Sequence, residues 1–363
     1  MPKTGSTSIQ QYLSNGLSDP AFRYVRLGEI CSNWGLTILF SSHPEREPGL
    51  AQHGIGKKQI AGMEARFREQ LEKETAAAAA AGAVLVLSAE RVWNESEDTL
   101  QRIATFFGDR GFAVHIMGYV RPYKSFMEAR FQQQVKSKLR ISNRKEPIGL
   151  MPDPFPSFFG NVSMFDGVFG RENVEFFPYA TEALEQGCIV RDFCARTGMA
   201  SHAAPAVRYN EGIRLPAIRL LYAYRTFGPR IKAGLDSVRQ DRVMLKAMES
   251  LEGPPLRFHS ALVSPFLRPH GADISQLERR LGFPLAAQLD KDDQGLCICK
   301  EADLFEFDAA SLDWLARQSG SRPIRRQSGL AAAREVAAQV HRLYRQGAIN
   351  TWQPWQAFRR LWK

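Results

Sequence analysis

The sequence predicts an α/β protein: a parallel β-sheet flanked by helices, followed by a mostly helical C-terminal half. Over the first 200 residues or so, short apolar runs with polar ends alternate with helix-like segments. The run AVLVLSAE, residues 83–90, is continuously apolar until its polar end, as is typical of a strand buried on both faces. Beyond Gly198 the strand pattern fades, and residues 213–346 indicate helices broken by proline and glycine. We therefore expect a ligand site where the parallel strands end.

The individual elements follow from local patterns. A turn at residues 2–8 leads into a first helix. We expect strands at 22–28, 83–90, 112–120 and 174–179, and helices at 57–81, 96–107, 189–196 and from Arg121-Pro122 to about 139. The segment 36–40 fits either a strand or a buried helical turn, and 41–58 has the composition of an irregular loop.

Composition places the chain among globular proteins. It has 363 residues, of which 44% are hydrophobic and 24% charged. No run approaches eighteen apolar residues and no basic-then-hydrophobic start is present, so we expect a cytoplasmic protein. The five cysteines form no CxxC pair and are odd in number, which argues against a zinc site and a disulfide framework.

Positive charge is concentrated at the C-terminal end. The net charge is +10, and from Ser321 onward nine Lys or Arg face one acid, Glu335. We divide the chain into an α/β core (1–200), a helical extension packed on it (201–320) and a basic, Trp-rich tail (321–363). The tail's Trp352, Trp355 and Trp362 either pack on their own domain, stack on sugars or make a weak contact with a membrane surface. No nucleic-acid partner is expected.

The stretch PKTGSTSIQ, residues 2–10, has the chemistry of an anion-binding turn. Glycine lets backbone amides approach an anion, a helix N-terminus presents unpaired N–H groups, and Lys3 adds a full charge. The same letters also suit an ordinary turn or N-cap. A nucleoside-triphosphate P-loop fits poorly, because GxxxxGK[ST] places its lysine after the second glycine and Lys3 precedes Gly5.

The order PKTGSTS, LSAE, YVRP with a long helix, and FGRENVEFFPY with VRDF resembles bacterial sulfotransferase-like proteins that use 3′-phosphoadenosine 5′-phosphosulfate (PAPS). The resemblance covers roughly residues 2–200. It implies a three-layer parallel sheet of the sulfotransferase and P-loop NTPase type. It also implies transfer of a sulfuryl group from PAPS to a hydroxyl or amine of a carbohydrate or other small acceptor, without a metal.

The resemblance assigns roles to residues of this chain. Lys3 would contact the phosphosulfate and stabilise charge on the leaving phosphate. The neighbouring residues of the loop would bind the same phosphate through amides and hydroxyls: Thr4, Gly5, Ser6, Thr7 and Ser8. Arg121 matches the arginine that grips the 3′-phosphate, and Tyr179 either lies near the adenine or is a core tyrosine. A serine usual eight positions after Arg121 is Ala129 here, and Ser125 is an imperfect substitute.

A general base must remove the acceptor's proton. Glu90 is the first candidate because it ends an expected buried strand at the ligand rim, and a capping or salt-bridging carboxylate is the alternative. His53, in the loop GLAQHGIGKK, is the second candidate, and Glu29 is a third.

The resemblance also implies a central strand directly before the phosphate loop, where this chain has only Met1 before Pro2. We expect either a start further upstream or a vacant central position in the sheet. The vacancy and Ala129 favour an alternative function, a non-catalytic nucleotide- or glycan-binding protein of sulfotransferase ancestry. A kinase-like phosphotransferase is a third class, for which a Walker-type lysine and a metal-binding Asp after a strand are lacking.

Overall fold

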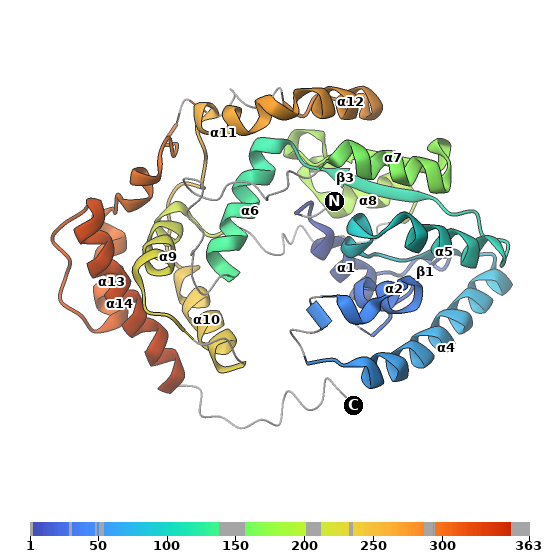
Figure 1. The fold of residues 1–363 in the computed structure, drawn as a ribbon, viewed down its shortest axis with the longest axis horizontal. Coiled ribbons are helices and arrows are strands. Elements are labelled where there is room, and N and C mark those ends of the chain that lie inside the picture. The colour runs from blue at the N-terminus through green and yellow to red at the C-terminus, as the bar shows by residue number, and fades with distance from the viewer. Residues whose placement is uncertain are drawn as a thin grey trace. The chain divides into compact units, whose positions relative to one another are not determined.

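The computed structural model describes residues 3–28, 31–47, 49–50, 54–137, 157–200, 212–231, 235–286, 293 and 295–349 (Figure 1). The chain divides into two compact units. Unit 1 comprises residues 1–123, 156–211 and 270–286, and unit 2 comprises 124–155, 212–269 and 287–363.

The strands lie in unit 1 and form two separate parallel ribbons. In the first, β1 (Phe22–Tyr24) pairs with β2 (Val84–Val86). In the second, β3 (Ile116–Val120) pairs with β4 (Val174–Pro178). The chain is therefore an α/β protein with parallel strands, and each strand is shorter than the pattern predicts. The described residues contain two two-stranded sheets instead of one continuous sheet.

Four helices of unit 1 match segments expected to be helical, namely the first helix and those at 57–81, 96–107 and 189–196, whereas the helix at 158–169 was not expected. The helices of this unit are α1 (Ser6–Asn15), α2 (Asn33–Phe40), α4 (Lys57–Ala81), α5 (Glu97–Gly108), α7 (Phe158–Phe169), α8 (Ile189–Thr197) and α12 (Gly271–Leu281). The expected helix 57–81 is confirmed, and it ends because Gly82 adopts a left-handed conformation with φ of 61°. The ambiguous segment 36–40 is helical. Short 3-10 turns connect these elements, among them η1 (Pro44–Arg46), η2 (Glu90–Asn94), η3 (Arg171–Asn173), η4 (Thr181–Ala183) and η5 (Glu185–Gly187).

Helix α1 packs across both ribbons. Its Ile9, Tyr12 and Leu13 belong to a cluster that includes Tyr119 of β3 and is contacted by residues of all four strands. The partly buried strand residues of this cluster are Phe22, Tyr24, Val86 and Phe177. One helix thus covers a face that the two ribbons share.

Aromatic side chains pack on the face of β4 that carries Phe176. Phe176 lies edge-on to Trp93 and Phe165, with ring centroids 5.6 and 6.2 Å apart. Because successive strand residues point to opposite faces, Phe176 and Phe177 contact different layers. The ribbon β3–β4 is therefore covered on both sides.

Unit 2 is helical over its described residues, with only isolated bridges between extended segments. Its helices are α6 (Tyr123–Ser137, beginning at the last residue of unit 1), α9 (Leu215–Phe227), α10 (Leu235–Met248), α11 (Ser260–Leu267), α13 (Ala309–Ser319) and α14 (Gly329–Ile349), with 3-10 turn η7 (Glu301–Phe305). A further turn, η6 (Arg268–His270), follows α11. Helix α9 is buried along almost its whole length, and its Arg225 donates to the carbonyl of Val135 at 3.1 Å and to Asp241 at 2.9 Å. This buried arginine joins three helices.

Within the described residues, no helix combines the length and the apolar character needed to cross a membrane.

Candidate phosphate-loop site

The predicted loop is a tight turn with two residues in the left-handed region. Lys3 has φ of 67° and Gly5, the N-cap of α1, has φ of 74°. A side chain at position 5 would be strained by this φ, and its Cβ would lie 3.1 Å from the ring of Tyr179. A left-handed non-glycine residue costs on the order of 1 kcal/mol or more, so surrounding contacts must hold Lys3 in place.

The start of α1 has the geometry expected of an anion site. The amides of Ser8 and Ile9 bond to the Gly5 carbonyl at 2.9 and 3.4 Å. The earlier amides, those of Ser6 and Thr7, have no acceptor within the helix and carry its positive dipole end. This end of the helix therefore favours negative charge.

Arg121 holds the loop from the side of β3. Its Nη1 donates to the backbone carbonyl of Lys3 at 2.9 Å, and its guanidinium lies 5.3 Å from the centre of the Tyr179 ring. Arg121 follows the last residue of β3, and Tyr179 follows the last residue of β4, with its amide bonded to the Val120 carbonyl at 2.8 Å. The carboxyl end of this ribbon thus brings a cation and an aromatic ring to the loop.

Glu90 approaches the loop from the side of β2. The Ser6 hydroxyl donates to Glu90 Oε2 at 3.1 Å, and the Gln10 amide donates to the Ser88 hydroxyl at 3.1 Å. The expectation that Glu90 ends a strand is corrected: β2 ends at Val86, and Glu90 begins the 3-10 helix η2. The Val86 carbonyl accepts from the Val25 amide at 3.0 Å, and the Ser88 carbonyl then accepts from the amide of Ser32, the N-cap of α2, at 2.9 Å, so strand pairing does not continue.

The structure therefore brings most of the predicted residues together. Lys3 to Ser8, Glu90, Arg121 and Tyr179 share one neighbourhood, and the side chains of Thr4 and Ser8 are buried there. Ser125 and Ala129 lie on α6, which belongs to unit 2 from Lys124 onward. His53 and Glu29 lie outside the described residues.

Gln10 is the residue that the sequence analysis missed. It is buried although polar, and it joins α1 to the end of β2. The sequence does carry a signal for this residue. Gln10 lies on the helix face of Ile9 and Leu13, so position 10 is one where an apolar residue is expected. A buried amide needs a hydrogen-bond partner, which here is Ser88.

A buried polar network supports the ribbon beneath the site. Tyr119 donates its hydroxyl to Asp192 Oδ2 at 2.7 Å, and Arg196 pairs with the same carboxylate at 2.6 Å. Burial, together with the Asp192 hydrogen bond, raises the pKa of the Tyr119 phenol. The network ties α8 to β3 one residue before its end.

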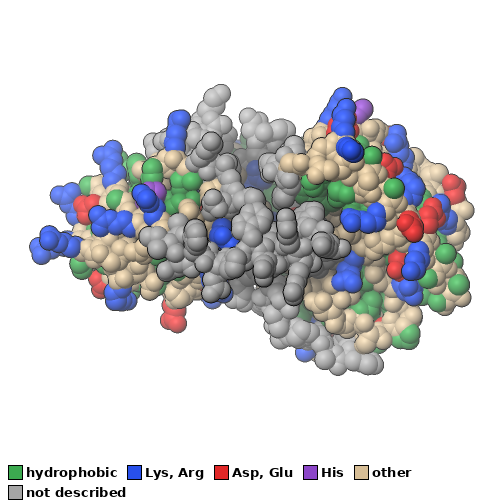
Figure 2. Space-filling model, turned by 90° about the horizontal axis from the view of Figure 1, so that it is seen from below, with side chains coloured by type: hydrophobic (Ala, Val, Ile, Leu, Met, Phe, Trp, Pro, Cys, Tyr) green, Lys and Arg blue, Asp and Glu red, His purple; other side chains and the backbone are tan. Residues whose placement is uncertain are grey.

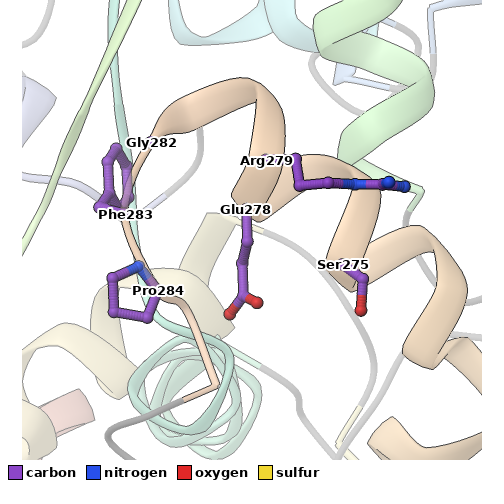
Figure 3. Close-up of a pocket in the computed structure, with 6 residues that line it drawn as sticks. All are labelled: Ser275, Glu278, Arg279, Gly282, Phe283 and Pro284. Carbon is purple, nitrogen blue, oxygen red and sulfur yellow. The ribbon is translucent and has the colours of Figure 1, made fainter.

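A separate open pocket of about 610 Å³ lies at the C-terminal end of α12 (Figure 3). Its lining residues are Ser275, Glu278, Arg279, Gly282, Phe283 and Pro284. The Glu278 carboxylate accepts from the amides of Leu285 and Ala286 at 2.6 and 2.8 Å, so its charge closes the turn after the helix. None of the sequence-predicted site residues lines this pocket.

Comparison with protein-family models, with curated proteins and with solved structures finds no match for this chain. Among the described residues, no group of three or more His, Cys, Asp or Glu side chains is placed to hold a metal ion.

Proposed function

We propose that this chain is a PAPS-dependent sulfotransferase acting on a hydroxyl or amine of a carbohydrate or other small acceptor. One observation carries the proposal: the loop of Lys3, the guanidinium of Arg121 and the carboxylate of Glu90 converge at the start of α1. Glu90 and Arg121 lie 84 and 118 positions from the loop residues that they contact, and their convergence supports a base beside an anion-binding turn.

The loop side of the site supplies positive potential. PAPS would supply the sulfuryl group and a phosphate that gains negative charge as the group leaves. Lys3, the first amides of α1 and Arg121 are preorganised donors for that charge, and such donors lower a barrier most when they need no rearrangement. The bond from Arg121 to the Lys3 carbonyl keeps its guanidinium at the loop, where a phosphate would meet its positive charge.

Glu90 is the proposed base. As the acceptor oxygen or nitrogen bonds to sulfur, the bond from sulfur to the 5′-phosphate breaks and the acceptor's proton passes to the Glu90 carboxylate. The Ser6 hydroxyl, bonded to Glu90 Oε2, fixes the orientation of that carboxylate next to the loop.

We further propose that the two ribbons are halves of one three-layer sheet, with a strand position between β2 and β3 that none of the described residues occupies. The Val84 amide and the Val86 carbonyl form hydrogen bonds on the side of β2 that faces β1. Successive residues of a strand direct their amides and carbonyls to opposite sides, so the amide and carbonyl of Leu85 face the other edge of β2. The Val120 carbonyl accepts from the Tyr179 amide, which directly follows β4, so the amide and carbonyl of Tyr119 face the edge of β3 away from β4. The shared cover of α1 over both ribbons supports this arrangement.

The alternative function is a non-catalytic binding protein of the same ancestry. The interrupted sheet and Ala129 favour it, because they weaken the anchoring of the loop and the expected grip on a 3′-phosphate. The contact between Ser6 and Glu90 also resembles a hydroxyl–carboxylate pair for Mg²⁺, which favours testing ATP with Mg²⁺ as a ligand.

The experiment measures binding of PAPS, of its product 3′-phosphoadenosine 5′-phosphate (PAP) and of Mg²⁺-ATP by calorimetry, and sulfate transfer to a panel of hydroxylated acceptors. We expect Lys3→Ala to abolish PAP binding, whereas Lys57→Ala, which removes an exposed lysine at the start of α4, leaves it unchanged. Glu90→Gln should keep PAP affinity and lose turnover.

PAP binding without any sulfated product supports the non-catalytic alternative. Tighter binding of Mg²⁺-ATP than of PAP overturns the sulfotransferase proposal. Normal turnover by Glu90→Gln removes Glu90 as the base.

A further inference from the structure

A half-buried tryptophan, Trp34, lies beside the residue that follows Glu90. The Arg91 guanidinium is 5.7 Å from the centre of the Trp34 ring, and the Arg91 amide donates to Asn33 Oδ1 at 3.1 Å. Asn33 and Trp34 begin α2, and both keep part of their surface in water. Because consecutive Cα atoms are about 3.8 Å apart, an indole held against Arg91 is also close to the backbone of Glu90. The start of α2 thus brings an aromatic ring next to the proposed base.

The loop between α2 and α4 completes this group. Glu47 Oε1 accepts from Arg91 Nη2, and it also accepts from the Gly49 amide at 3.2 Å. A Cβ at Gly49 would lie 3.0 Å from Trp34 Cη2, so the loop backbone lies against the edge of the indole. The side chains of Arg91 and Glu47 are 35% and 19% exposed. We call Asn33, Trp34, Glu47 and Arg91 the Trp34 cluster, whose members hold one another in place and still reach water.

The Trp34 cluster and Glu90 retain hydrogen-bonding atoms of both kinds that have no partner in the part of the chain that the structure describes. The acceptors are Glu47 Oε2 and Glu90 Oε1, and the donors are Asn33 Nδ2 and Arg91 Nη1. Glu47 and Arg91 neutralise each other, so the cluster has no excess of positive charge. The right-hand part of Figure 2, the side on which Figure 1 draws α2 and α4, shows Lys and Arg interspersed with Asp and Glu. The cluster therefore suits a neutral ligand that both donates and accepts hydrogen bonds.

We propose that the Trp34 cluster is the acceptor subsite and that it binds a neutral saccharide. The C–H face of a sugar ring is apolar and its hydroxyls both donate and accept, so an indole and planar polar side chains together match it. An anionic saccharide would meet the Glu90 carboxylate without a cation to offset the repulsion, since Arg91 is paired with Glu47. A hydroxyl of a sugar ring that covers Trp34 would meet Oε1 of Glu90. The inference rests on the proposed function for the role of Glu90 as base, and it narrows the acceptor to a neutral carbohydrate.

The test titrates the full chain, without nucleotide, with maltohexaose, cellohexaose and chitohexaose and with a hexamer of galacturonic acid, by calorimetry and tryptophan fluorescence. We expect a neutral hexasaccharide to bind and the acidic one to bind more weakly. Trp34→Ala should weaken binding of the neutral saccharide about 30-fold, as is typical of a truncated tryptophan anchor, whereas Trp34→Phe should retain part of the affinity. Trp314→Ala removes a half-buried indole of unit 2 and is the matched control, which should leave binding unchanged.

A second variant tests the polar contacts without deleting the ring. Asn33→Asp keeps an oxygen that accepts from the Arg91 amide but removes the Nδ2 donor, and should lower the affinity for the neutral saccharide about 5-fold. In sulfate transfer, Trp34→Ala should raise the KM for the acceptor while the affinity for PAP stays the same.

Failure of the subsite and failure of the proposed function have different signatures. The subsite is overturned if no neutral saccharide binds, if the acidic hexamer binds more tightly, or if Trp34→Ala and Trp314→Ala change the affinity equally. A protein that binds a neutral saccharide through Trp34, yet neither binds PAP nor transfers sulfate, overturns the sulfotransferase proposal and supports the saccharide site.

Discussion

The two ribbons of unit 1 differ in how well they are covered. The ribbon β3–β4 pairs over five residues, and Tyr119, Val120, Val174 and Phe176 are buried. The ribbon β1–β2 pairs over three residues, and Val84 is 54% exposed although it belongs to an entirely apolar run. Burial on both faces favours longer strand pairing, because an apolar strand whose side chains stay in water gains little free energy from pairing. Both ribbons nevertheless end beside the phosphate loop.

The largest expected effect is on the covered ribbon. Phe176→Ala removes a ring that packs against Trp93 and Phe165, and should lower the free energy of unfolding by about 3–5 kcal/mol. Urea denaturation followed by circular dichroism measures it. A loss below about 1 kcal/mol would contradict the tight packing of this ribbon.

A smaller effect is expected at the network behind β3. Tyr119→Phe deletes the hydroxyl bonded to Asp192 and should cost about 1–3 kcal/mol of unfolding free energy. Tyr222→Phe removes a comparable bond to Glu301 in unit 2 and is the control. Only the first substitution is expected to weaken the proposed binding of PAP, because Tyr119 lies two residues before Arg121, whereas Tyr222 belongs to unit 2.

The pH dependence of stability tests the packing of α1, the helix that covers both ribbons. Burial, aided by Cys194, raises the pKa of Tyr12 to about 12 from 10.0. The folded state therefore holds this proton more tightly than the unfolded state, and its stabilisation is complete below pH 10 and is lost as the pH rises towards about 12. Melting temperatures should fall over that interval, and Tyr12→Phe should make the fall less steep. An unchanged slope would show that Tyr12 is not the responsible group.

The smallest effect is expected on the exposed strand. Val84→Ala should change the free energy of unfolding by no more than about 0.5 kcal/mol, because the side chain already contacts water over half its surface. The same denaturation assay used for Phe176→Ala makes the comparison direct. A cost comparable to that of Phe176→Ala would mean that both ribbons are equally packed.

The sequence predicted those elements whose signals are local. Helix α4 begins and ends where its composition indicates, with Gly82 as its left-handed cap, and Arg121 directly follows a strand as expected. The strand lengths were overestimated. An apolar run such as that in residues 83–90 shows that a segment can be buried, but it does not show whether a neighbouring strand is present to pair with it. The assignments to Ser125 and His53 stay predictions.

By itself the sequence determined the chemistry available at the start of α1: a lysine, a glycine and hydroxyls leading into a helix. Only the tertiary structure decided that Glu90 meets Ser6, that Arg121 holds the Lys3 carbonyl and that Gln10 bonds to Ser88. The reason is physical. Helix caps and periodicity depend on residues a few positions apart, whereas these contacts join residues 78 to 118 positions apart and depend on how α1 packs across both ribbons.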